Sequence, residues 1–173
     1  MAELSHWQKI IVPQRKKDTG CVPTGFEWLI RYQDIKGIDL ANFQDEFDRT
    51  AQKRGDNSFD SVATEVKQKY SHVSIQVKGF DKAEDKIASI KDFITKDIPC
   101  LLSFPTYVTL CPCSLCFHMV PVVFIDDTKM KIICDADKDG NQTCDLLINN
   151  VICWHNIFKG GNDIAWLPKT VHP

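Results

Sequence analysis

Several features that assign other sequences to a function are absent from this 173-residue chain. No run of about 18 apolar residues occurs, so the sequence predicts no membrane-spanning helix. The net charge of -2 is spread over the chain without long blocks of one sign, which argues against a nucleic-acid-binding surface or a disordered tail. Internal repeats and low-complexity segments are also missing. What remains is the composition of one compact domain, residues 1–173, that is large enough to bury its own core.

The N-terminal segment, residues 1–7, has no apolar core of the kind found in secretory signals, so we expect a cytoplasmic protein. The chain nevertheless contains eight cysteines. In a reducing compartment we expect them to be reduced, metal-bound or reactive, whereas a mature secreted form could carry disulfides. The chemistry of the cysteines is therefore the main question for function.

The order of hydrophobic patterns predicts an α+β fold. Apolar residues recur at helical spacing over residues 23–33, 40–55 and 61–70, so the first half is expected to be mainly helical. A strand at 73–77 and a helix at 83–96 follow, and the remaining predicted strands are 98–104, 117–125, 130–134 and 164–167. Helices first and antiparallel strands later favour an N-terminal helical half packed on a C-terminal antiparallel sheet. The groove between the two halves is then the natural site.

Cys21 lies at the start of the first predicted helix. Pro23 suits the first helical position, which places Val22 outside the helix and Cys21 just ahead of it. Only a thiolate attacks carbon, and a helix N-terminus can lower a cysteine pKa from about 8.5 to roughly 3.5–7.5. Position alone does not separate a nucleophile from a structural thiol, because unpaired cysteine is among the most buried residue types. A partner base is needed to decide.

A candidate base and a candidate carboxylate lie far from Cys21 in the sequence. His118 begins an apolar row on the predicted strand 117–125, and Asp135 ends the neighbouring strand, where hairpin pairing could bring it alongside His118. A lone histidine in such a row is more often structural. With a cysteine and a carboxylate, however, it supplies what thiol acyl transfer needs, since the base takes the thiol proton and the third group orients the base. Gln14 would add an N–H donor for the oxyanion, beside the backbone N–H of Cys21.

Several segments follow one another in an order that is similar to a known family. They are Val-Pro-Gln at 12–14, Thr-Gly-Cys-Val-Pro-Thr at 19–24, the helix and strand of 90–104, His-Met-Val-Pro-Val-Val-Phe-Ile-Asp-Asp at 118–127, Cys-Asp at 134–135, and the aromatic segment 158–166. Together they resemble the papain-like cysteine peptidases of the type that cleaves double-glycine bacteriocin leaders, including their stand-alone relatives. The resemblance covers most of the chain from Val12 to Trp166. It implies a papain-like fold, with Cys21, His118 and Asp135 as catalytic residues and Gln14 in the oxyanion hole.

Three positions depart from the family pattern. Pro121 interrupts the strand after His118 and, because proline cannot donate to a ladder, predicts a bulged or edge strand. Ala136 stands where the family has a proline after the aspartate, which leaves Asp137 as an alternative to Asp135. The spacing between Gln14 and Cys21 varies among relatives, so Gln14 is the least constrained member of the set.

Two metal-site hypotheses compete for some of these residues. Three thiols and the imidazole of His118 fall within one short segment, a density that suits tetrahedral zinc, and a zinc-bound His118 could not act as a base. The thiols are those of Cys111, Cys113 and Cys116, and Cys100, Cys134, Cys144 or Cys153 could add a fourth ligand. The spacing is not that of a standard zinc knuckle, and buried or disulfide-linked cysteines are the alternative.

Residues 135–141 begin like a calcium-binding loop, but position 12 of that loop is Leu146 where a bidentate glutamate is required. A polar turn after a strand is the expected structure there. We therefore predict that the protein needs no metal and no cofactor.

The sequence thus predicts a cysteine peptidase that cleaves a peptide or isopeptide-type amide through a thioester intermediate. Two alternatives remain open: a related acyltransferase that uses the same triad, and a non-catalytic papain-like module that binds a peptide or a partner protein. The expected partner is a peptide or protein substrate, with no nucleic acid and no membrane. The sequence leaves the oligomeric state and the cleavage specificity undetermined.

Overall fold

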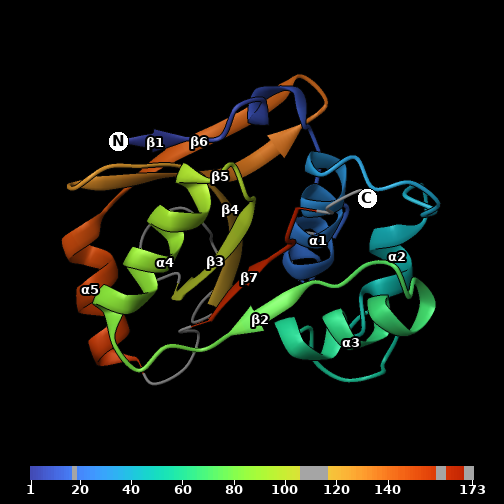
Figure 1. Cartoon of the computed structure of the whole chain (residues 1–173). Coiled ribbons are helices and arrows are strands. Elements are labelled where there is room, and N and C mark those ends of the chain that lie inside the picture. The colour runs from blue at the N-terminus through green and yellow to red at the C-terminus, as the bar shows by residue number, and fades with distance from the viewer. Residues whose placement is uncertain (17–18, 106–116, 159–162, 170–173) are drawn as a thin grey trace.

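The computed structural model describes residues 1–16, 19–105, 117–158 and 163–169, and a mixed sheet-and-helix core joins them (Figure 1). The described strands form one antiparallel sheet in the order β2-β7-β3-β4-β5-β6, and the short β1 pairs with β4 outside that order. The strands are β1 (Ala2–Glu3), β2 (Gln76–Lys78), β3 (Cys100–Pro105), β4 (Phe117–Ile125), β5 (Lys129–Asp137), β6 (Gly140–Leu147) and β7 (Ile164–Trp166).

Helices pack on the sheet from two sides. They are the 3-10 helix η1 (Trp7–Lys9), α1 (Cys21–Tyr32), α2 (Phe43–Phe47), α3 (Phe59–Lys69), α4 (Ala83–Thr95) and α5 (Ile148–Ile157). In Figure 1, α4 and α5 lie together to the left of the sheet, whereas α1, α2 and α3 lie to its right. Among the helices of the described residues, none combines the length and apolarity needed to cross a lipid bilayer.

Helix α1 is buried on almost every side, because its sequence is apolar around most of its circumference. Gly25 permits its close approach to β3, since a Cβ at that position would lie 2.7 Å from Cδ1 of Leu101. The helix begins earlier than predicted. Gly20 is its N-cap and Cys21 its first residue, so the prediction that Cys21 precedes the helix is wrong. Pro23 fits the third position because the first amides of a helix have no intrahelical acceptor.

The second predicted helix, residues 40–55, is reduced to the single short helix α2. Asp48 ends it with a non-helical ψ of 85° and turns its carboxylate toward three partners. That carboxylate accepts hydrogen bonds from the backbone N–H of Ala51 at 3.0 Å, from the hydroxyl of Thr19 at 2.6 Å and from the side-chain N–H of Asn57 at 2.8 Å. Tertiary hydrogen bonds thus override a helical apolar spacing. The helices α3 and α4 follow the predictions closely, whereas β6 and α5 were not predicted.

The strand that carries His118 has the predicted bounds, residues 117–125. It lies inside the sheet between β3 and β5, so Pro121 does not mark an edge; Pro121 pairs with Leu101 of β3. A register shift between Val122 and Phe124 interrupts the pairing with β5. The strand is therefore bulged and interior.

Candidate active site

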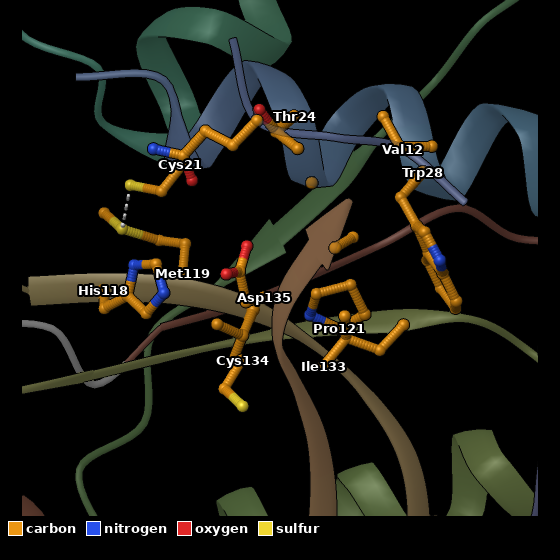
Figure 2. A pocket seen from close by; sticks show the side chains of 14 residues that line it. Val12, Cys21, Thr24, Trp28, His118, Met119, Pro121, Ile133, Cys134 and Asp135 are labelled. Atoms are coloured by element: carbon orange, nitrogen blue, oxygen red, sulfur yellow. Dashed lines mark hydrogen bonds between the residues drawn. The ribbon is translucent and has the colours of Figure 1, made fainter. Parts of the chain in front are cut away.

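A cavity of about 50 Å³ lies between the N-terminal half of α1 and the strands β4 and β5. All four residues predicted for the site line it: Gln14, Cys21, His118 and Asp135. Figure 2 shows Cys21 on the helix, facing the strands that carry His118 and Asp135. Segments far apart in the sequence thus meet at one place, although the sequence supplied only their order.

The backbone around Cys21 is held by a tight turn. The N–H of Gly20 donates to the carbonyl of Lys16 at 2.9 Å, and a Cβ on Gly20 would lie only 2.7 Å from that oxygen. A side chain at position 20 would therefore push the turn apart. The first helical bond follows at once, from the N–H of Thr24 to the carbonyl of Gly20 at 3.0 Å. Cys21 is half-buried, and its thiol donates to Sδ of Met119 at 3.6 Å.

Thr19 ties this turn to the end of α2. Its hydroxyl donates to the carboxylate of Asp48, and Asn57 donates its side-chain N–H both to the Thr19 carbonyl at 2.6 Å and to Asp48 at 2.8 Å. Burial raises the pKa of Asp48, but the hydrogen bonds from Thr19, Ala51 and Asn57 outweigh it, so the pKa lies below its usual value. An ionised, fully bonded carboxylate therefore holds the residue two positions before Cys21.

Gln14 lies against the same turn. Its Cγ would be 3.4 Å from a Cβ on Gly20, and its side-chain amide donates to the carbonyl of Lys16 at 2.8 Å. One carbonyl thus accepts from both the Gln14 side chain and the backbone of Gly20. The Gln14 amide is anchored next to the start of α1.

His118 faces β5 from β4. Burial lowers the pKa of its imidazole, while a hydrogen bond to the Cys134 backbone and the negative charge of Asp135 raise it in part. The resulting pKa lies below the usual histidine value, so the ring is neutral near pH 7. A neutral imidazole is the form that can accept a proton from a thiol.

Asp135 and Asp137 have different surroundings. Asp135 lines the cavity, whereas a carboxylate oxygen of Asp137 accepts from the N–H groups of Asp139 and Gly140 at 2.8 and 3.0 Å. Asp137 therefore stabilises the turn between β5 and β6, which is the polar turn expected in place of a calcium loop. Of the two aspartates, the cavity favours Asp135 as the partner of His118.

The cysteines divide into several kinds. Cys134 and Cys144 form a disulfide between β5 and β6, with their Cα atoms 5.9 Å apart, so the prediction of reduced cysteines is wrong for this pair. Cys134 lies where the β5–β6 register shifts, between Ile133 and Asp135, and Cys144 is opposite the nearby Ile132. Cys100 is fully buried, which raises its pKa to about 12, and Cys153 is exposed.

The described residues contain no group of three or more histidine, cysteine or acidic side chains that could hold a metal ion. The candidate ligands Cys111, Cys113 and Cys116 lie outside the described residues. The disulfide occupies Cys134 and Cys144, which leaves neither available as a thiolate ligand.

Met119 and Trp28 are among the lining residues of the cavity that were not predicted for the site. Met119 contacts the Cys21 thiol, yet strand alternation places it on the face opposite His118, so no sequence signal indicates it. Trp28 lies at the other end of the cavity, where Figure 2 shows it with Val12 and Pro121. Its position two helical turns after Cys21 was a usable signal. Val12, Trp28 and Pro121 make this end of the cavity apolar.

Comparison with known proteins bears on the fold. No protein-family model matches the sequence, and no curated protein matches it. Among solved structures, the chain is similar to the crystal structure of a protein from Bacillus anthracis that is provisionally assigned as a C39-like peptidase. The TM-score is 0.59, and the match covers 97% of this chain and 98% of that chain. The chain has the fold of a C39-like peptidase.

The sequence identity to the C39-like structure is 13%, so the similarity concerns the fold. It confirms the predicted α+β papain-like architecture, with a helical N-terminal half and a C-terminal sheet. The resemblance to the double-glycine type of these peptidases stays a prediction.

Proposed function

We propose that the protein is a cysteine peptidase that hydrolyses an amide bond in a peptide or protein substrate. The observation that carries this proposal is the single cavity that Cys21, His118, Asp135 and Gln14 line together. The C39-like peptidase fold supports it, because the likeness extends over nearly the whole chain. Fold alone does not determine activity, so the side chains carry the argument.

The chemistry follows from the roles of these groups. Neutral His118 takes the proton of the Cys21 thiol, and the thiolate attacks the carbonyl carbon to form an S–C bond. The backbone N–H of Cys21 and the amide of Gln14 hold the resulting oxyanion. Protonated His118 then gives its proton to the leaving amine as the C–N bond breaks, which leaves a thioester on Cys21. His118 next takes a proton from water, whose attack releases the acid and restores the thiol, while Asp135 orients the ring.

The structure adds one requirement to this cycle. The Cys21 thiol donates to Sδ of Met119 at 3.6 Å, and this contact has to break when the thiol proton passes to His118. A thioether is a weak acceptor, so the loss of this contact costs little.

Replacing Cys21 or His118 by alanine tests the proposal. We expect each variant to lose all release of fluorophore from a pooled library of fluorogenic peptides that includes double-glycine sequences, because nucleophile and base act as a unit. Circular dichroism should show that both variants remain folded. The matched control is Cys153→Ala, which removes an exposed thiol remote from the cavity and should keep full activity. Near-normal turnover in either test variant contradicts the mechanism.

A second candidate function is a non-catalytic module that binds a peptide in the same cavity. The apolar end of the cavity, lined by Val12, Trp28 and Pro121, favours it, because such a lining can bind an apolar side chain of a peptide without any bond being cleaved. The two candidates differ in the reactivity of Cys21, because only the peptidase requires an activated thiolate there.

A further inference from the structure

Gln44 is a buried polar residue on the short helix α2, with 5% of its surface exposed. It does not line the cavity. We infer that Gln44 is a positioning residue that fixes Gln14 relative to Cys21. This inference rests on the proposed function, in which Gln14 binds the oxyanion.

The side chain of Gln44 forms hydrogen bonds to the backbone on both sides of Gln14. Its side-chain N–H donates to the carbonyl of Pro13 at 3.0 Å, and its side-chain oxygen accepts from the N–H of Arg15 at 3.0 Å. The peptide groups immediately before and after Gln14 are thus bound to one side chain. Rotation of the Gln14 backbone would break one or both bonds.

The same side chain also forms hydrogen bonds to two residues of α1. Its N–H donates to the carboxylate of Glu27 at 2.9 Å, and its oxygen accepts from the hydroxyl of Thr24 at 2.8 Å. Thr24 lies one helical turn after Cys21. Glu27 is itself held by Arg31 at 2.8 Å. Gln44 therefore connects the segment carrying Gln14 to the helix carrying Cys21.

The hydrogen bonds of Gln44 permit one orientation of its amide. A glutamine amide has two N–H donors and an oxygen that accepts two bonds, and all four are used here. A flipped amide would set an N–H against the Arg15 N–H and an oxygen against the Pro13 carbonyl. Fully satisfied buried networks are rigid, so the spacing between the segment and the helix is fixed.

Such rigidity matters for an oxyanion hole. Its donors act only when they meet the position that the oxyanion will occupy, and a displacement of about 1 Å can lower a rate about 100-fold. Gln14 is half-buried on a segment that has no regular secondary structure, so its own element does not fix it. Gln44 supplies that constraint.

Two probes of Cys21 separate positioning from general damage. A short acetylated peptide aldehyde adds its carbonyl carbon to Sγ while the thiol proton passes to His118, and the resulting oxyanion needs the donors. Iodoacetamide reacts by displacement of iodide at a saturated carbon and forms no oxyanion. In Gln44→Met, which keeps the side-chain size, we expect the aldehyde affinity to fall about tenfold. The rate of Cys21 alkylation should stay within about twofold of the unmodified protein.

The control for lost stability is Lys86→Met. Lys86 is similarly buried, at 2% exposure, but lies on α4 and does not line the cavity. It should leave both probes unchanged. If Gln44→Met unfolds, the neutral Gln44→Asn is used, which keeps an amide but is one methylene shorter and so cannot reach all four partners. We expect a smaller, about threefold, loss of aldehyde affinity in that variant.

A double-mutant cycle with Gln14→Ala tests whether Gln44 acts through Gln14. If it does, Gln44→Met weakens the aldehyde in the natural chain but adds little once Gln14 is alanine. Additive losses, an unchanged aldehyde affinity in the Gln44 variants, or an equal loss in alkylation overturns the inference. An unaffected Gln14→Ala variant also overturns it, by removing the oxyanion role of Gln14. The peptidase proposal stands or falls separately, on Cys21→Ala and His118→Ala.

Discussion

The two sides of the sheet bury polar residues in different ways. On the side of α1 and α2, the buried polar side chains Glu27, Gln44 and Asp48 are each held by two or more hydrogen bonds. On the side of α4 and α5, the Lys86 ammonium donates once, to the Ser103 carbonyl at 3.1 Å. Within the described residues, Nδ1 of His155 has no partner.

The difference between the two sides indicates where side chains have to be held in a fixed position. The networks of the α1 side end on the residues around the cavity, because Asp48 holds Thr19 and Gln44 holds both neighbours of Gln14. On the far side, Lys86 donates one hydrogen bond, to the Ser103 carbonyl, and the charge of Asp163 acts on it. A network of hydrogen-bonded side chains therefore marks the side of the molecule where the candidate chemistry lies.

The largest effect on stability is expected from Asp48→Ala. Thr19, Ala51 and Asn57 would lose a buried acceptor, and because each orphaned donor costs about 1–3 kcal/mol, the free energy of unfolding should fall by about 4 kcal/mol. Urea unfolding followed by tryptophan fluorescence measures it. Since the folded pKa of Asp48 is lowered, the contribution is present above the ordinary value of 3.8 and lost as the pH falls through the folded pKa.

The control for Asp48 is Asp45→Ala on the same helix. Asp45 is exposed and forms only surface ion pairs with Arg15 and Lys16, so its loss should change the free energy of unfolding by less than about 1 kcal/mol. Equal losses in the free energy of unfolding from the two substitutions would show that the hydrogen bonds around Asp48 contribute no more to stability than surface ion pairs do.

A somewhat smaller effect is expected from Lys86→Met, and its size depends on pH. Burial lowers the pKa of Lys86 from 10.5 to about 8, with partial compensation by the charge of Asp163. Between these values the unfolded chain binds the proton and the folded chain does not, so stability rises with pH. Relative to Lys86→Met, the natural chain should therefore gain about 3 kcal/mol between pH 7 and pH 10.5.

Taking the difference between the two chains removes the effects of Tyr32 and Cys100, whose pKa values are both raised to about 12. A difference that does not change with pH would mean that burial leaves the pKa of Lys86 unchanged. The comparison between the two sides would then fail.

Much of the fold could be predicted because a long segment with a regular hydrophobic period indicates a helix or a strand by itself. Strand β4 and helix α4 are strongly patterned, and both were predicted within a residue or two. By contrast, β6 lies at the edge of the sheet and has one fully buried residue, so it shows no alternation. At the early end of α2, Asp48 accepts a hydrogen bond from the hydroxyl of Thr19, and no local pattern contains a partner that lies 29 residues away.

The residues of the candidate site likewise fall into those that could be predicted from the sequence and those that could not. Cys21, His118 and Asp135 could be predicted because their chemistry and order are visible in the sequence, and the structure places them around one cavity. Gln44 could not be predicted, because the sequence between Phe43 and Phe47 does not show whether a glutamine there is buried or exposed; only its hydrogen-bond partners show it. The pairing of Cys134 with Cys144 likewise depends on strand register, which eight cysteines leave undetermined.

The activation of Cys21 by His118 is tested most directly by iodoacetamide labelling with peptide mapping, which needs no substrate. Exposed Cys153 is the internal reference in the same sample. At about pH 6, we expect Cys21 to react at least tenfold faster than Cys153, because a paired base supplies thiolate below the ordinary thiol pKa. His118→Ala should abolish this excess. If Cys21 and Cys153 instead follow the same pH dependence, or if the excess survives in His118→Ala, His118 does not activate Cys21 and the peptidase mechanism is contradicted.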